Sequence, residues 1–476
     1  MRLLLWLLSL AALSVGARNF EQGISIDGPL YASIARNIAR SSEWFRLDGG
    51  IPDFLPFAEH PHLGFWLQAL IFKILPAADW SARISGHIFY VAALALAYKI
   101  TERLFSARAA SFTVLILWSW GVFSNYFSNF YLDPGCLVFG TLFIVLFHKS
   151  LEEDDLNITR NALLAGFFLG LAFLQKGLAA LGFGPVALVM LALAFKRSTR
   201  PASQFLMTTI VLAVCLTILG TYFMAVQFST VPEFFDIYWT RQFTGRFGRQ
   251  VNFSGLLSLK FWSRLNDDTH KLLLVVPFAM FALRKHRLAL VYVLSFFASF
   301  LLMYATNRRT GGQYWLMLMP PLAIVLGAGL DEILRKFGPK LSQDPQKLQR
   351  ITQALSLALV CLLQYLPIST HTPRKPIEAD TLVSLKKIHS LEGLTLVRPH
   401  NKKSDFTLGA SLAWYTDLKL SYLDRGAYLR RIHEIQPRPT EAYLVLGGRP
   451  AMLPQGLCET PHAGASQILV PCIIKN

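Results

Sequence analysis

The chain alternates between long apolar runs and short polar loops, and the apolar runs have the length of membrane-spanning helices. A bilayer core about 30 Å thick needs roughly 20 mostly apolar residues per helix. About eleven segments fit this template. They cover residues 2–17, 82–98, 108–127, 133–148, 161–175, 178–195, 204–226, 271–283, 288–305, 314–330 and 351–368. The pattern predicts an α-helical polytopic membrane protein.

The loops between these segments fall into a basic set and a set with few basic residues. The basic set contains Lys99, Arg103, Arg108, Lys149, Arg160, Lys196, Arg197, Arg200, Arg284, Lys285, Arg287, Arg335, Lys336, Lys340, Lys347 and Arg350. The opposite loop 128–132 has no basic residue. Because cationic loops resist translocation, we expect the N-terminus and the basic loops in the cytoplasm. Residues 18–81, residues 227–270 and the tail from about residue 370 are then outside.

The first apolar segment allows two interpretations. Residues 2–17 form either a retained first span or a secretory signal peptide, because they have a charged start, an apolar middle and a small-residue end. The orientation of everything downstream is the same in both cases. A retained span would also hold the residues that follow it at a fixed depth.

The tail differs in composition from the rest of the chain. Residues 1–370 read as the transmembrane domain, whereas residues 371–476 are more charged and carry short apolar runs between helix-like pieces. We predict a small α/β domain outside the membrane. Cys458 and Cys472 could form a disulfide in an oxidising compartment, and the alternative is two free buried thiols.

Composition and charge support the membrane setting. Hydrophobic residues make up 53% of the 476 residues, and the formal net charge is +17. The cytoplasmic loops account for much of this charge, so it does not indicate a nucleic-acid partner. On the outer side stand Arg241, Arg246, Arg249, Arg308 and Arg309. Guanidinium groups bind phosphate oxygens well, so these residues suit a phosphate-linked substrate, or simply attract anionic lipids.

Asp27 follows the first apolar segment and precedes an amphipathic stretch. Residues 29–41 place apolar side chains such as Ile34 on one helical face and arginines such as Arg36 on another, the pattern of an interfacial helix. Asp27 is therefore either the N-cap of this helix or a catalytic carboxylate at the outer interface.

Other polar residues near the outer ends of spans suggest chemistry. Asp133 could cap a span or work beside Asp27, one carboxylate accepting a proton while the other orients a partner. Glu59, His60 and His62 could bind a divalent metal ion or be ordinary solvated side chains. Lys176 could snorkel at a span end or neutralise a phosphate. We find no nucleotide-binding glycine loop.

Five stretches in order, DGPLYASIARNIARS, EHPHLGFWLQALIFKIL with SARISG, NFYLDPGCLVFGTLF, AFLQKGLAALGFGP and NRRTGGQYWLMLMPPLAIVLGAGL, resemble the membrane glycosyltransferases of the GT-C fold. The resemblance covers about residues 20–335 and is strongest to bacterial aminoarabinose transferases acting on lipid A and to protein mannosyltransferases. It implies an inverting transfer of a sugar from a polyprenyl-phosphate carrier to a lipid or protein acceptor, at the outer face of the inner membrane.

The resemblance also implies roles for residues. Asp27 matches the family's catalytic first-loop Asp, and Asp133 matches a second acidic residue near the active site. Glu59 stands at the Glu of a motif implicated in metal binding. The remaining matches, which imply phosphate or substrate contacts, are Lys176, Arg246 with Phe247, the late basic cluster Arg308 and Arg309, and Tyr314.

Departures from the family pattern affect the metal site and the donor. His60 replaces the usual Lys, His62 replaces the second Pro of a Pro-Pro pair, and the His expected before the Arg-Phe pair is missing, with Gln242 or Phe243 in that region. These changes leave open whether a metal is bound with His60 or His62 as substitutes. They also leave the donor sugar open.

Two other classes compete with the transferase interpretation. A transporter or lipid flippase would share the polytopic topology, but transporters tend to place ionisable residues inside spans near the midplane. Here the predicted spans are nearly free of charge and acidic residues gather at the outer interface. An inactive scaffold of the same fold is the third interpretation.

Overall fold

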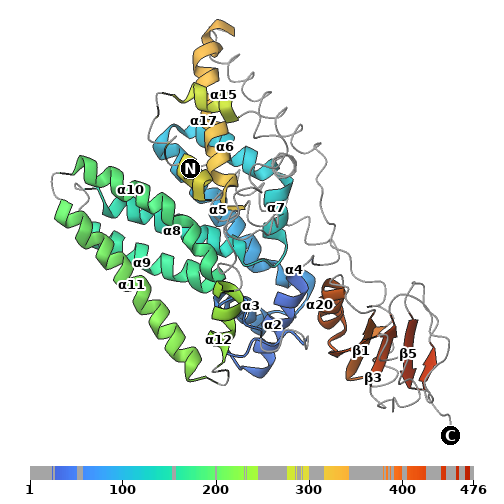
Figure 1. Cartoon of the computed structure of the whole chain (residues 1–476). Helices are drawn as coiled ribbons and strands as arrows, with labels where there is room; N and C mark the ends of the chain where they lie inside the picture. The colour runs from blue at the N-terminus through green and yellow to red at the C-terminus, as the bar shows by residue number, and fades with distance from the viewer. Residues whose placement is uncertain are drawn as a thin grey trace. The chain divides into compact units, whose positions relative to one another are not determined.

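The computed structural model describes a large part of the chain (Figure 1). The described residues are 24, 27–50, 57–152, 157–198, 201–229, 231, 233–244, 276–284, 286, 291, 293–299, 316–341, 379, 382, 383, 386, 391–398, 405–424, 441–445, 457–459 and 467–471. They belong to two compact units. The helical unit comprises Met1–Phe20, Glu59–Gly64 and Arg83–Thr370, and the mixed unit comprises Glu21–Ala58, Phe65–Ala82 and His371–Asn476.

The described part of the helical unit is built from helices, and those between residues 84 and 244 follow one another with short connections. Its elements are α5 (Ile84–Leu104), α6 (Ala107–Ser119), α7 (Gly121–Ser128), α8 (Asp133–Ser150), α9 (Ile158–Lys176), the 3₁₀ turn η2 (Gly177–Phe183), α10 (Gly184–Arg197), α11 (Pro201–Gln227), α12 (Phe234–Tyr238), the π-helical turn η3 (Trp239–Thr244), α15 (Val276–Ala282) and α17 (Met319–Leu341). In Figure 1, α8 and α9 are drawn in teal, and α10 and α11 in green. α9 packs along both α8 and α11, and α17 packs along α6.

Small residues let these helices approach closely. A Cβ atom added to Gly166 of α9 would lie 2.5 Å from the carbonyl oxygen of Val211 in α11. Helices in a membrane gain little from the hydrophobic effect against lipid, so close van der Waals packing over small residues is their usual means of association.

Three described helical stretches are long and apolar enough to cross a membrane. They are Asp79–Leu104, Ile158–Arg197 and Pro201–Gln227. The 40-residue stretch Ile158–Arg197 is about twice the length that one crossing needs, and it contains two predicted segments, 161–175 and 178–195. Residues 2–17 and 351–368 lie outside the described residues, so the count of eleven spans stays a prediction.

The predicted span 108–127 is not one straight helix. α6 and α7 are bent by 66° at their junction, where Trp120 has an extended backbone with φ −77° and ψ 97°. The Trp120 side chain is fully buried. Hydropathy did not predict this break, because a residue that leaves the helical conformation remains apolar.

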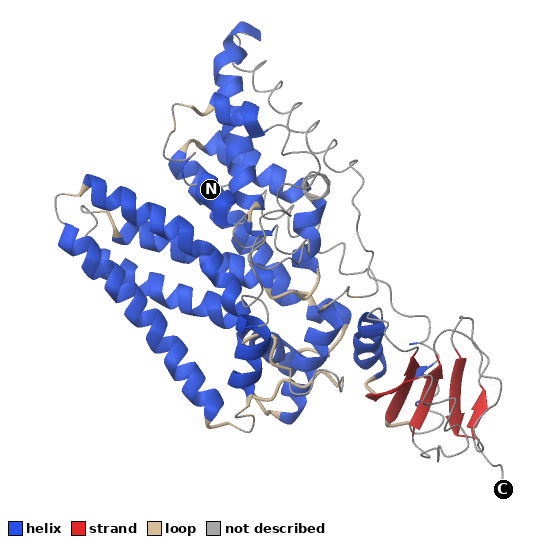
Figure 2. Ribbon diagram, in the orientation of Figure 1, coloured by secondary structure: helices blue, strands red, loops and turns tan. Residues whose placement is uncertain are grey.

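The mixed unit contains helices from the first predicted outer loop and a sheet from the tail. Its elements are α2 (Gly28–Ser41), α3 (Leu63–Ile74, of which residues 65–74 belong here), α4 (Asp79–Ala82), β1 (Gly393–Arg398), α20 (Asp405–Thr416), β2 (Lys419–Asp424), β3 (Glu441–Val445), β4 (Leu457–Glu459) and β5 (Gln467–Pro471). The strand order is β2-β1-β3-β5-β4. Figure 2 shows these strands in red.

The sheet is mixed, and its register follows the apolar runs of the tail. β1 pairs in parallel with β2 and β3, with Leu394 opposite both Leu420 and Ala442. β5 is antiparallel to β3 and β4. β1, α20 and β2 form a strand–helix–strand connection, which is the usual way to join adjacent parallel strands.

The amphipathic helix expected after Asp27 is α2, and its apolar face is buried. Leu30, Ile34 and Ile38 are each at most 2% exposed. The arginine face departs from the interfacial pattern, because Arg36 is only 7% exposed. α2 packs along α20 of the tail, and Arg36 contacts the end of α20, so part of the arginine face expected to meet water is covered by protein.

Candidate active site

The helical unit brings together two residues that the sequence singled out separately. Asp133 begins α8 and Lys176 ends α9, and the Lys176 Nζ atom forms an ion pair with the Asp133 Oδ2 atom. Their side chains are 9% and 4% exposed. A carboxylate at a helix N-terminus and an ammonium at a helix C-terminus both complement the helix dipoles. The pair therefore lies where two helix ends meet.

Helix capping by Asp133 and snorkelling by Lys176, the structural roles that the sequence allowed, do not fit the surroundings of these residues. The residue before α8 that takes the cap position is Leu132, and no side-chain cap hydrogen bond is made there. Lys176 is buried rather than extended toward water, so it does not snorkel. A buried charged pair costs desolvation free energy, which makes it a candidate for a functional role.

Gln175 fills the space beside this pair, and the sequence analysis missed it. A Cβ atom on Gly64 or Gly135 would lie 2.8 Å or 2.6 Å from the Gln175 Nε2 atom. Two glycines, one in the first turn of α3 and one at the start of α8, thus leave room for the amide. Gln175 is 1% exposed, and its Oε1 atom has no hydrogen-bond partner in the described structure. The position next to Lys176 was its only signal.

Gly177 follows the last residue of α9 and has a backbone conformation that residues with a side chain rarely adopt. Its φ is +63°, in the left-handed region that favours glycine. A Cβ atom there would lie 2.1 Å from the hydroxyl oxygen of Tyr238 and 3.3 Å from the Cδ atom of Pro61. The end of α9, the 59–64 loop and α12 therefore meet at this glycine, immediately after Lys176.

The 59–64 loop uses its polar side chains in contacts with the helices around it. The Gln242 Nε2 atom donates to Glu59 Oε2 at 2.8 Å, so the region where the family has a histidine does contact Glu59. His62 is fully buried, with Nδ1 2.6 Å from the hydroxyl oxygen of Tyr222 and its ring 4.8 Å from the ring of Phe234.

These contacts give no support to the predicted metal site, which stays a prediction. Within the described residues, no three His, Cys, Asp or Glu side chains come together in a way that could hold a metal ion. Glu59 and His62 are each engaged with a different helix segment, and His60 is half-buried. No step of the chemistry considered below is assigned to a metal.

Asp27 lies in the mixed unit, directly before α2. Its backbone is helical, with φ −82° and ψ −18°, and its side chain makes no capping hydrogen bond. Its carbonyl oxygen accepts from the Tyr31 amide at 3.0 Å, as the carbonyl of an N-cap residue does. Asp27 therefore occupies the N-cap position of α2, but its carboxylate is not used for capping, and its catalytic role stays a prediction.

The other predicted contacts lie outside the described residues: Arg246, Arg308, Arg309 and Tyr314. Arg241 is described and exposed in η3. Cys136 and Cys215 are buried free thiols in α8 and α11, as small hydrophobic side chains would be. The pairing of Cys458 with Cys472 stays a prediction, because Cys472 is not described.

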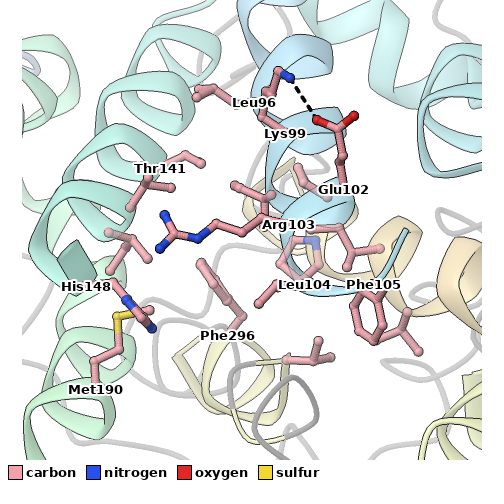
Figure 3. A pocket seen from close by; sticks show the side chains of 18 of the residues that line it. Leu96, Lys99, Glu102, Arg103, Leu104, Phe105, Thr141, His148, Met190 and Phe296 are labelled. Carbon is pink, nitrogen blue, oxygen red and sulfur yellow. Dashed lines mark hydrogen bonds and ion pairs between the residues drawn. The ribbon is translucent and has the colours of Figure 1, made fainter. Parts of the chain in front are cut away.

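A separate cavity of about 510 Å³ lies in the helical unit along α8 and contains none of the predicted site residues (Figure 3). Its lining is mostly apolar, with residues such as Ile144, Met190 and Phe296. Lys99 and Arg103 stand at its rim, and their charges are paired with acidic residues at 2.8 Å and 3.2 Å, respectively. These rim residues come from the loops predicted to be cytoplasmic.

Comparisons with known proteins agree with this architecture. Residues 59–220 match the family described as dolichyl-phosphate-mannose-protein mannosyltransferase. A curated relative is an undecaprenyl phosphate-alpha-4-amino-4-deoxy-L-arabinose arabinosyl transferase of Pseudomonas savastanoi pv. phaseolicola, 26% identical over 195 residues. The match spans 40% of this chain and 36% of that relative's length.

Solved structures cover more of the chain. ArnT from Cupriavidus metallidurans, bound to undecaprenyl phosphate, has a TM-score of 0.72 at 15% identity, covering 98% of this chain and 97% of ArnT. The oligosaccharyltransferase of Archaeoglobus fulgidus, in complex with zinc and sulfate, has a TM-score of 0.58 at 13% identity, covering 92% and 67%.

These findings define a helical membrane protein of the GT-C fold class. Within that class, residues 59–220 are similar to the protein mannosyltransferase family, and the chain is similar to aminoarabinose transferases.

Proposed function

We propose that the protein is an inverting glycosyltransferase that moves a sugar from a polyprenyl-phosphate carrier to a lipid acceptor similar to lipid A, at the outer face of the bacterial inner membrane. The names of its relatives support the donor class, since one is an undecaprenyl phosphate-dependent transferase and another was solved with undecaprenyl phosphate. The motifs around Asp27, Asp133 and Lys176 support the reaction.

The reaction requires one bond to form and one to break at the anomeric carbon. The acceptor hydroxyl oxygen attacks that carbon from the face opposite the phosphate, and the carbon–oxygen bond to the phosphate breaks. The bonding electron pair leaves with the polyprenyl phosphate. Asp27 accepts the hydroxyl proton as general base. Cationic side chains stabilise the negative charge that grows on the leaving phosphate.

The single observation that supports this chemistry best is the buried Asp133–Lys176 pair. An ammonium has three donors, so Asp133 can orient Lys176 while other donors remain for a phosphate oxygen. Arg246, Arg308, Arg309 and Tyr314 are further candidates for donor contacts by their match to the family's motifs. We propose that Asp133 acts by holding Lys176 in place.

The test is sugar transfer in reconstituted membranes with labelled polyprenyl-phosphate sugars. Asp27→Asn should lower kcat by roughly 10²–10⁴-fold, the range for loss of a general base, with little change in thermal unfolding. Glu43→Gln is a matched control, because it removes an exposed carboxylate of the same unit, 48% exposed and paired with Arg46 at 3.5 Å. Equal activity of Asp27→Asn and wild type would disprove the role of Asp27.

The acceptor can be tested in the same membranes. The family description of the 59–220 region names protein mannosyltransferases, so a protein O-glycosyltransferase is the second candidate. Transfer to lipid A-like glycolipid and to a Ser/Thr-containing protein substrate should be compared with the same donor. Label only in the lipid fraction supports the first candidate, and label only in protein supports the second.

The transporter alternative predicts a different result. It would move lipid or sugar across the bilayer without forming a new glycosidic bond. α11 runs from residue 201 to residue 227 without any Asp, Glu, Lys, Arg or His, whereas transporters tend to place ionisable residues within their spans. Label crossing the vesicle membrane without transfer would favour this alternative.

A further inference from the structure

The C-terminal end of α20 is joined to α2 by a buried arginine. Arg36 donates from Nη1 to the carbonyl oxygen of Trp414 at 2.8 Å and from Nη2 to that of Ala413 at 3.1 Å. Its Nη2 atom also lies 3.1 Å from Asp417 Oδ1. The last carbonyls of a helix lack partners within the helix and carry its negative dipole end. Arg36 therefore caps α20 from a distant part of the chain.

The charges of this contact are held by their surroundings. Burial lowers the pKa of Arg36 to about 10, although Asp417 acts in the opposite direction. Burial by itself would raise the pKa of Asp417, but Arg36 and Arg40 outweigh it and hold that pKa below its usual value. Both groups are consequently charged at neutral pH. Arg40 adds a second ion pair to Asp417 at 2.6 Å.

The same end of α20 makes contacts with three other segments. The Trp414 Nε1 atom donates to Asp79 Oδ1 at 2.8 Å, and the Tyr415 hydroxyl donates to Asp79 Oδ2 at 3.2 Å. The Trp414 ring stacks on Phe72 of α3, with centroids 5.8 Å apart. The Ile24 amide donates to the Tyr415 hydroxyl oxygen at 3.0 Å.

Two of these contacts lie on either side of Asp27 in the sequence. Ile24 precedes Asp27 by three residues and is held by Tyr415, while Arg36 follows it by nine and is held by Trp414 and Asp417. Asp27 is continuous with α2 through the hydrogen bond from the Tyr31 amide. The backbone that carries Asp27 is thus fixed at both ends by one short segment of the tail.

We propose that this contact, the α20 clamp formed by Arg36, Asp79, Trp414, Tyr415 and Asp417, positions Asp27 for the transfer reaction. The inference rests on the proposed function. Arg36 and Asp417 are positioning residues, since they act through α2. A general base must lie within hydrogen-bond reach of the proton it accepts, and a displacement of about 1 Å can cost on the order of 100-fold in rate.

The test measures transfer kinetics and backbone protection on the same full-length variants. Asp417→Asn should lower kcat about 10-fold or more and change the KM for the polyprenyl-phosphate sugar much less, because the clamp does not bind the donor. Amide hydrogen exchange of residues 28–41 should become faster, with no change in α8 or α9. Asp417→Glu keeps the charge and should restore most of kcat.

Two further variants separate positioning from folding. Arg40→Gln removes only the outer arginine, whose side chain is 58% exposed, so the variant should fold and show a smaller fall in kcat. Glu43→Gln removes an exposed carboxylate that is also paired with an arginine, and should leave both kcat and the exchange of α2 unchanged. If Asp417→Asn does not fold, Arg40→Gln carries the test.

The outcomes distinguish this inference from the proposed function. A fall in kcat together with faster exchange in α2 supports the clamp. Wild-type transfer with an unchanged kcat in Asp417→Asn and Arg40→Gln overturns the clamp and leaves the proposed function intact. No transfer by wild type from any carrier overturns the proposed function, and the positioning role with it.

Discussion

Each of the two units contains an ion pair with a buried cation, and the two pairs are built differently. In the helical unit, Lys176 and Asp133 are both nearly inaccessible, and within the described part of the chain Asp133 is the one carboxylate partner of Lys176. In the mixed unit, Arg36 has two carbonyl acceptors as well as Asp417, whose side chain is 39% exposed. Among the residues that the structure describes, Lys176 therefore has few alternative acceptors, whereas Arg36 has several.

This difference indicates different tasks. A buried pair with a single partner leaves an uncompensated charge when either member changes, and such an arrangement contributes little net stability. It is better explained by a need for a charge at that place. An arginine with several acceptors instead joins separate segments of the chain. A cavity of about 790 Å³ beside Arg36 gives the Asp417 carboxylate access to water.

The largest expected effect follows from Lys176→Met. The free energy of unfolding should fall by about 3–5 kcal/mol, because the Asp133 carboxylate would stay buried without its partner. Denaturant titration in detergent micelles measures this change. Lys99→Met is the matched control, since the Lys99–Glu102 pair is 2.8 Å long but 64% and 36% exposed, and it should cost at most about 1 kcal/mol. Equal losses of unfolding free energy in Lys176→Met and Lys99→Met would contradict the expected difference between a buried and an exposed pair.

Arg36→Met should have an intermediate effect. We expect a loss of about 1.5–3 kcal/mol, the range for hydrogen bonds to charged groups, because Asp417 can be solvated and Arg40 remains as its partner. The same titration measures it, with Arg46→Met as a control on an exposed arginine of the same unit, 54% exposed. A loss larger than that of Lys176→Met would reverse the ranking of the two pairs.

The smallest expected effect is on how the free energy of unfolding depends on pH in acid. Because the pKa of Asp417 is lowered in the folded protein, its stabilising contribution is fully present above the ordinary Asp pKa of about 3.9. It is lost as the pH falls through the lower folded pKa. Asp417→Asn should lack this acid-dependent component, which we expect to be no more than about 1 kcal/mol. Unfolding followed from pH 6 to pH 3 checks it, and identical pH profiles would contradict it.

The sequence predicted the helices better than it predicted the contacts between them. The apolar segments 82–98, 161–175 and 204–226 correspond to α5, α9 and α11, because a span of lipid-compatible residues has few other structures available. The bend at Trp120 was not predicted, since apolarity does not distinguish a helical residue from an extended one.

The candidate site shows the same limit. Asp133 and Lys176 were selected individually, by residue type and by resemblance, but their pairing across 43 positions depends on how α8 packs on α9. Tyr238 had no signal in the sequence, and Gln175 and Gln242 were marked only by their position beside other motif residues, since amides and tyrosines occur in many places. The acceptors of Arg36 in α20 could not be inferred from α2, because they are backbone atoms of another helix.

The α20 clamp has a consequence for the order of events during synthesis. Arg36 and Trp414 are separated by 378 positions, so α2 leaves the ribosome long before its partner exists. At about 5–20 residues per second, the delay is roughly 20–75 seconds. During that interval the Arg36 side chain has neither its carbonyls nor its carboxylate. The segment that carries Asp27 can therefore reach its final arrangement only after nearly the whole chain has been translated. Synthesis of the tail thus sets the earliest time at which the first outer loop can complete its structure.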